Sequence, residues 1–405
     1  MTAVTESTRT VLPDRDKPAA RQVRRQLGGV RATDVLALFG ALAGALATTG
    51  LLWTELSPFS GVLGYVVTSW LLFVVLYAIL LSFDENRPAV RARVASAVIH
   101  SLALLLVGAL VFVIIYTVSR GWRALVHANF YTQDMRDAGP LDPITVGGIK
   151  HAIIGTLIEI TITLIIAVPL GVLGAVFLHQ VPGRFSRFVR TVVEAMTALP
   201  DIMAGLFIYA TLILTFGLDT SGLAASCALA VTILPIIIRT GDVVLRLVPG
   251  GLTEASYALG SGQWRTVWHV LLPTARSGLV TAVILGTARA IGETSPVLLT
   301  AGFTADLNLD PVHGPMVSLP LEAYQMVQSP EPAMIARGFG TAAILLLLVV
   351  VLFTLARLIG GRGAGQLTAG QRRRRARSSL GDLRRFAARS SDIATVQDEQ
   401  GDPAR

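Results

Sequence analysis

The sequence predicts an all-α, polytopic membrane protein with about eight transmembrane helices. Of its 405 residues, 53% are hydrophobic and only 15% are charged, whereas globular proteins average about 25% charged residues. The apolar residues form runs of about 18 or more, long enough for a helix to cross a ~30 Å hydrocarbon core. Because these runs lack the alternation typical of strands, we expect helices rather than a sheet to span the bilayer.

The apolar runs define eight expected spans in chain order. The fifth is interrupted by Leu199-Pro200-Asp201, and we expect Pro200 to break or kink the helix there because proline cannot donate a backbone hydrogen bond. The expected spans are Asp34–Trp53, Val62–Phe83, Ser96–Val118, His151–Leu178, Ala195–Phe216, Gly222–Val244, Gly278–Ala301 and Gly338–Arg357.

The basic residues indicate the orientation of these spans. Residues 1–33 contain seven Lys or Arg and no early apolar stretch of the signal-peptide kind. The loops 84–95, 179–193 and 245–277 each carry three arginines, and the C-terminal tail contains a cluster of arginines at 372–375. All of these lie on one side if both termini do, so the positive-inside rule predicts that both termini are cytoplasmic.

Three segments outside the spans allow two interpretations each. The segments 119–150 and 302–337 fall on the extracytoplasmic side, where they form either an outer vestibule or simple connections. The Arg-rich tail 361–405 suggests contact with nucleic acid or with anionic lipid. Because it follows a membrane span directly, we expect lipid contact, no nucleic acid and little order.

The cytoplasmic loop EASYALGSGQWRTVWHVLLP, residues 254–273, contains the most specific pattern in the chain. Thr253 is a candidate cap for a short helix that Gly260 ends, and a second short helix is expected over 263–272. Trp264 and Trp268 lie on one face of that helix, together with Leu271. Such a face fits either a groove in a partner protein or the lipid interface.

This loop resembles the EAA motif of the permease subunits of ABC importers. Five motif positions are in register: Glu254, Ala255, Gly260, Leu272 and Pro273. In that family the loop is a coupling helix that docks on a separate ATPase subunit, which implies that Trp264 and Trp268 also face this partner. The chain has no GxxxxGK[ST] phosphate loop, so ATP and Mg²⁺ are expected on the partner, with no cofactor, metal site or enzymatic activity in this chain.

The resemblance narrows to the PstA-type permeases of phosphate-specific ABC importers. It rests on GDVVLRLVPGGLTEASYALG, ARAIGETSPVLLTAG and ALPDIMAGLFIY. One departure is Asp201, which stands where a small hydroxyl residue is expected. The resemblance covers about residues 95–360, a six-helix type I permease core, and leaves 1–33 as a basic tail and 34–94 as an additional hairpin.

The resemblance implies a set of partners and a location. These are a second, PstC-type permease, a PstB-type ATPase dimer, an extracytoplasmic PstS-type phosphate-binding protein, and the lipid of a bacterial plasma membrane. Alternatives are a permease for molybdate or sulfate, a secondary transporter, and a membrane sensor of phosphate. The EAA motif disfavours the secondary transporter, which would not need an ATPase.

Two charged residues within the expected span 278–301 are the main candidates for a substrate pathway. Arg289 and Glu293 are four residues apart and so share one helix face. An arginine at mid-span costs about 2.5–3.5 kcal/mol, so the pair should face protein or water. It is either an ion pair that holds the bundle together or a site where Arg289 binds a passing anion, since its planar fork suits phosphate.

Further details of this pair follow from its chemistry. Pro296 lacks the N–H that the carbonyl of Gly292 would bind in a continuous helix, so a free carbonyl is expected beside Glu293. Glu293 would compete with the anion for Arg289. It can also accept a hydrogen bond from the O–H that phosphate retains near neutral pH and sulfate lacks. Replacing Glu293 by Gln should therefore weaken discrimination between these anions.

Two more charged residues are candidates for the pathway. Arg239 ends an apolar run and resembles a basic position of the family, so it is either a pathway residue or an interfacial anchor. Glu159 lies within the expected span 151–178. It either pairs with Arg289, lines the path, or makes a hydrogen bond between helices.

Overall fold

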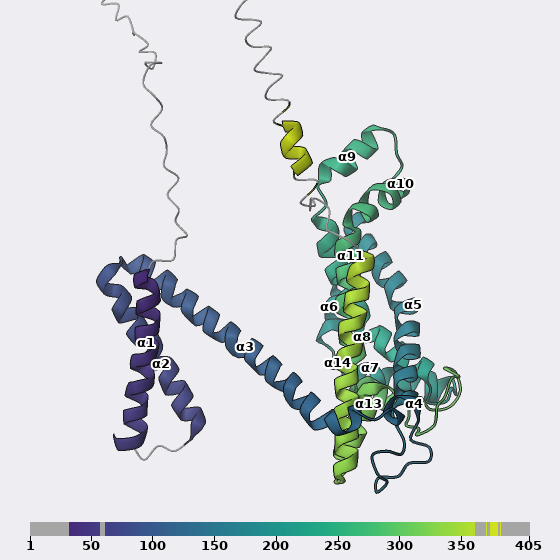
Figure 1. The fold of residues 1–405 in the computed structure, drawn as a ribbon. Coiled ribbons are helices and arrows are strands. Elements are labelled where there is room, and N and C mark those ends of the chain that lie inside the picture. Colours follow the sequence, from purple (N-terminus) through teal and green to yellow (C-terminus); the bar gives the residue numbers. More distant parts are fainter. Residues whose placement is uncertain (1–31, 57–60, 361–369, 371–372, 380, 382–405) are drawn as a thin grey trace, which may run out of the picture. The chain divides into compact units, whose positions relative to one another are not determined.

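The computed structural model describes residues 32–56, 61–360, 370, 373–379 and 381, and these residues form helices without strands (Figure 1). Among the described residues, seven helices are long and apolar enough to cross a membrane, and a bent pair forms an eighth candidate. The predicted all-α membrane fold with about eight spans is therefore confirmed. The predicted tails, 1–33 and 361–405, lie almost wholly outside the described residues.

The chain packs as two compact units, residues 1–111 and 112–405. The first unit contains α1 (Ala32–Leu51), a short π-helical turn (Leu52–Leu56), α2 (Val62–Asp84) and the beginning of α3 (Arg87–Leu125). Tyr77 and Leu81 of α2 pack with Ala41 of α1 in its small core. Because α3 is one continuous helix across the division, the packing units differ from the predicted boundary at 94/95, which stays a prediction.

The second unit contains the remaining helices and all candidate site residues. Their bounds are α4 (Asn129–Thr132), α5 (Lys150–Gln180), α6 (Arg184–Ala198), α7 (Asp201–Ile208), the π-helical η2 (Tyr209–Thr215), α8 (Gly222–Arg246), α9 (Gly250–Ala258), α10 (Gln263–Thr266), the π-helical η3 (Val267–Leu271), α11 (Leu272–Gly292), α12 (Ser295–Thr300), α13 (Leu319–Gln328) and α14 (Pro332–Gly360).

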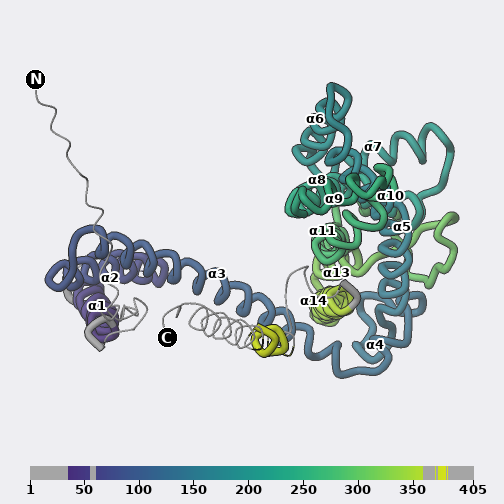
Figure 2. The backbone as a smooth tube through the Cα atoms, turned by 90° about the horizontal axis from the view of Figure 1, so that it is seen from above, coloured from purple at the N-terminus to yellow at the C-terminus, as the bar shows by residue number. Residues whose placement is uncertain are grey.

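Helix α8 lies at the centre of this unit, where it contacts α5, α6, α7, α11 and α12 (Figure 2). It packs most extensively on α5. A Cβ at Gly171 of α5 would lie 2.5 Å from Cγ2 of Ile237, so only glycine permits this approach. Nearby, the hydroxyl of Ser226 donates to the carbonyl oxygen of Glu159 at 3.0 Å. Small residues and hydroxyl groups thus join the two helices, as in other membrane bundles.

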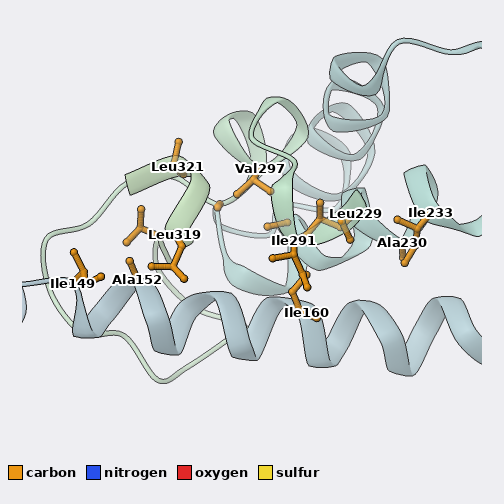
Figure 3. Close-up of a cluster of buried hydrophobic side chains, with 14 of the residues drawn as sticks. Ile149, Ala152, Ile160, Leu229, Ala230, Ile233, Ile291, Val297, Leu319 and Leu321 are labelled. Carbon is orange, nitrogen blue, oxygen red and sulfur yellow. The ribbon is translucent and has the colours of Figure 1, made fainter. Parts of the chain in front are cut away.

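The main hydrophobic core joins segments that are far apart in the sequence. Ile160 of α5 packs with Leu229 of α8, Ile291 of α11 and Val297 of α12, and Leu319 of α13 completes one end (Figure 3). All five side chains are at most 6% exposed. This core brings the helices on which the candidate residues lie together around α8.

Two of the expected spans are broken rather than continuous. The expected span 195–216 is divided at Leu199-Pro200, where α6 and the following α7–η2 helix meet at an angle of 105°. The expected span 278–301 ends as a regular helix at Gly292, and Glu293 is extended with φ −78° and ψ 125°. Pro296 lies in the first turn of α12, so it opens a new helix instead of disturbing an existing one.

Candidate functional site

Arg289 contacts two carboxylates, one of which the sequence did not single out as a partner. Its Nη2 donates to Oδ2 of Asp201 at 2.6 Å, and its Nε donates to Oε1 of Glu293 at 3.1 Å. The side chains are 48%, 28% and 18% exposed for Arg289, Asp201 and Glu293. The expected contact between Arg289 and Glu293 is present, although Glu293 lies just beyond the helix rather than on it.

The two broken spans bring these charges together. Asp201 is the first residue of α7, and Arg289 lies in the last turn of α11. A carboxylate is favoured at a helix N-terminus and a cation at a C-terminus, so each charge complements the dipole of its own helix. Beside them, a Cβ at Gly205 of α7 would lie 2.6 Å from Cα of Pro296 in α12. The absence of a side chain at Gly205 therefore allows α7 to pack closely on α12.

A small cavity of about 50 Å³ lies beside the ion pairs. It is bounded by the bend between α6 and α7, by α8 and by α11, and both Asp201 and Arg289 line it together with Thr232 and Pro235. Glu293 is not among the described residues that line it. Asp201 is therefore the carboxylate that faces this cavity, while Glu293 holds Arg289 from another direction.

Arg239 lies at a separate point along the same bend. Its Nη1 donates to Oγ1 of Thr197 at 3.3 Å, which ties α8 to the end of α6. Arg239 also lines a second cavity of about 140 Å³, together with Arg190, Glu194 and Asp242. The structure therefore places Arg239 near the α6–α7 bend but gives it no contact with Arg289, and its role stays open.

Glu159 is not brought to Arg289. Its side chain is 1% exposed within the main core, and Oε1 has no hydrogen-bond partner among the described residues. Its backbone carbonyl accepts hydrogen bonds from Thr163 and Ser226. A hydrogen bond between helices therefore exists at this position, but it is made by the main-chain carbonyl of Glu159 and not by its side chain. The alternative pairing of Glu159 with Arg289 is absent.

The loop 254–273 forms two short helices, as expected, but their limits differ from the expected ones. The first, α9, begins at Gly250, so Thr253 lies inside it and does not cap it. Gly260 ends the turn with φ +80°, a conformation that favours glycine. The second, α10, continues through η3 into α11, and Pro273 opens α11 rather than ending the preceding helix. The hydroxyls of Ser256 and Thr266 lie 2.9 Å apart and join the two arms.

This loop exposes a large apolar surface. Trp264 and Trp268 are 68% and 59% exposed, and Leu259 is 87% exposed. Leu271 is 1% exposed, so the expectation that it shares the face of the two tryptophans is wrong. The wider π-helical turn over Val267–Leu271 changes the register and directs Leu271 into the bundle. Glu254 and Ala255 lie on α9, both exposed, and Leu272 and Pro273 begin α11.

Sequence reasoning also missed a cluster of buried polar residues near the beginning of α5. His151 Nε2 lies 3.7 Å from Glu322 Oε1, and both side chains are at most 2% exposed. Arg337 is fully buried and donates to the carbonyl oxygens of Pro143 and Val146 at 2.9 and 2.6 Å. A polar residue within an apolar run was the available signal, but its partners lie on segments that the sequence does not connect.

The segments 119–150 and 302–337 are folded against each other. Met135 donates its N–H to the carbonyl oxygen of Ala305 at 3.0 Å, which joins the two expected outer segments. Within the second, the N–H of Val312 and the ring of His313 hold the pKa of Asp310 below its ordinary value. The segments are thus ordered, and their role as a vestibule or as connections stays open.

The chain is similar to a protein family, to individual relatives and to solved structures. Residues 167–362 match the family model described as binding-protein-dependent transport system inner membrane component. Phosphate transport system permease protein PstA 1 of Mycobacterium tuberculosis is 38% identical over 251 residues, which are 62% of this chain and 82% of the relative. PstA of Mycobacterium leprae is 36% identical over 67% of this chain and 89% of the relative. Among solved structures, the inward-facing MetNI methionine ABC transporter is 25% identical, covers 53% of this chain and 91% of that chain, and has a TM-score of 0.38.

Proposed function

The chain belongs to the PstA family of binding-protein-dependent permeases, and we propose that it forms half of the translocation pathway of an ATP-driven importer of inorganic phosphate. It is a multi-pass membrane transport subunit of an ABC importer rather than an enzyme. The specific substrate and the roles of individual residues are the proposal, and they rest on the geometry around Arg289.

The observation that carries this proposal is an accessible arginine where two broken helices meet. Arg289 is 48% exposed and lines a cavity. Among the described residues it donates two hydrogen bonds, whereas a guanidinium has five N–H groups. Donors therefore remain for an anion. Helix ends that meet within a membrane are a recurring way to place polar groups at a transport site.

The second part of the proposal is coupling through the cytoplasmic loop. The exposed surface of Leu259, Trp264 and Trp268 would dock in a groove of a PstB-type ATPase, which binds ATP and Mg²⁺. Because η3 runs without a break into α11, a displacement of the loop would reach the end of α11, where Arg289 lies. This continuity would link ATP binding to the anion site through one uninterrupted helical segment.

The proposed assembly contains three further kinds of protein. A PstC-type permease would supply the other half of the pathway, two copies of the ATPase would dock on the loops, and a PstS-type protein would deliver phosphate from outside. The complex would lie in the bacterial plasma membrane with both termini of this chain in the cytoplasm. The positive-inside rule supports this orientation, because the basic loops and both basic tails then all lie on the cytoplasmic side.

The test is ATP-dependent uptake of phosphate into proteoliposomes that contain the complex and its binding protein. Arg289→Gln should abolish uptake while the complex still assembles and hydrolyses ATP. Excess sulfate or molybdate should not compete with phosphate in the wild type. Normal uptake by the variant would make the ion pairs structural, and competition by another oxyanion would change the proposed substrate.

A further inference from the structure

The contact between Asp201 and Arg289 has a consequence for transport that rests on the proposed function. Two carboxylates surround one guanidinium, so the group of three carries a net charge of −1 with all of them ionised. A phosphate ion approaching this group meets electrostatic repulsion as well as the attraction of Arg289. Binding of the anion is therefore favoured when one carboxylate moves away.

Asp201 is the carboxylate whose position allows this movement. Glu293 lies four residues from Arg289 in the same segment of the chain, so the two residues move together. Asp201 is 88 residues from Arg289 and follows the bend at Leu199-Pro200. Asp201 also lines the cavity with Arg289, and Glu293 does not. An anion in this cavity would thus compete with Asp201 for the same guanidinium.

The size of the cavity supports the same assignment. About 50 Å³ gives room for about three to five water molecules at ~10–15 Å³ each. With the carboxylate of Asp201 in its present position, this volume leaves little room for a phosphate ion. Withdrawal of Asp201 would both enlarge the cavity and expose the donors of Arg289 that face it.

The breaks in the two spans provide a route for this withdrawal. Helices α7 and α12 pack on each other through Gly205 and Pro296, while Arg289 belongs to α11 on the other side of the break at Glu293. A rotation of the α7–α12 pair relative to α11 would separate Asp201 from Arg289 and leave the contact with Glu293 in place. We propose that Asp201 is an internal counter-anion that occupies Arg289 between transport cycles and that phosphate must displace.

The test is equilibrium binding of radiolabelled inorganic phosphate to the purified, nucleotide-free complex without its binding protein. Asp201→Asn keeps the shape of the side chain and removes the competing charge. It should tighten binding at least about fivefold, which corresponds to ~1 kcal/mol, the interaction of two unit charges about 4 Å apart at the dielectric constant of water. Release would be slower, so uptake per complex should fall.

Two further variants make the result specific. Asp201→Ser, with a small hydroxyl group, should also tighten binding, and it replaces Asn if that variant does not assemble. Asp306→Asn removes a carboxylate from an exposed Arg–Asp pair, with Arg136 at 3.7 Å, and should leave binding unchanged. A structural defect would weaken binding, so a gain in affinity is the distinguishing readout.

The outcomes separate this inference from the proposed function. If Arg289→Gln removes phosphate binding and both Asp201 variants bind as the wild type does or more weakly, the counter-anion assignment is wrong and the transport site remains. If Arg289→Gln binds and transports normally, both the site and the role of Asp201 are wrong. The inference is supported if the Asp201 variants bind phosphate more tightly than the wild type and Asp306→Asn does not.

Discussion

If the loop 254–273 docks on an ATPase as proposed, removal of its two exposed tryptophans should weaken this docking without unfolding the permease. Trp264 is 68% exposed, so about 130 Å² of a ring surface of roughly 200 Å² is accessible. Burial of this area on docking corresponds to about 3 kcal/mol at ~25 cal/mol per Å². Because part of the gain is offset by the cost of association, we expect Trp264→Ala to weaken docking about tenfold to a hundredfold.

The assay is titration of the ATPase subunit onto the permease pair in nanodiscs, with bound ATPase measured by fluorescence. Trp268→Ala should give a similar loss, since its side chain is 59% exposed. Trp122→Ala is the matched control, because Trp122 is 60% exposed but lies on α3, outside the loop. Unchanged docking in both loop variants would refute the coupling surface and indicate that the two tryptophans lie in the lipid interface.

Two other substitutions test the anion site and the packing that supports it. Glu293→Gln should raise the uptake of sulfate relative to phosphate, measured by competition in proteoliposomes. The neutral amide is a weaker acceptor for the phosphate O–H than the carboxylate, and its NH2 group can donate to sulfate. Unchanged selectivity in a transporting variant would contradict this. Gly205→Ala should destabilise the complex by about 1–3 kcal/mol, seen as a lower temperature of thermal unfolding, because its Cβ would lie 2.6 Å from Pro296. Gly108→Ala in α3 is the control, since no atom lies within 4 Å of its Cβ; equal melting of the two variants would argue against close packing of α7 on α12.

The sequence by itself determined the fold class, the approximate spans and the position of the loop 254–273 in the chain. These depend on local properties, namely the length of each apolar run and the glycine that ends α9. The contact between Arg289 and Glu293 was also predictable, because four residues along one chain remain neighbours even though the helix ends at Gly292. The break at Pro200 followed from the missing N–H of proline.

Only the tertiary structure decided which distant residues meet. Asp201 and Arg289 are 88 residues apart, and their contact depends on the 105° bend after α6 and on the packing of α7 against α12. The sequence left three roles open for Glu159, and the structure excludes a contact with Arg289 because α5 directs Glu159 into the main core. The hydropathy of a span predicts that a charge within it needs a partner. Which residue becomes that partner depends on how the helices pack around α8.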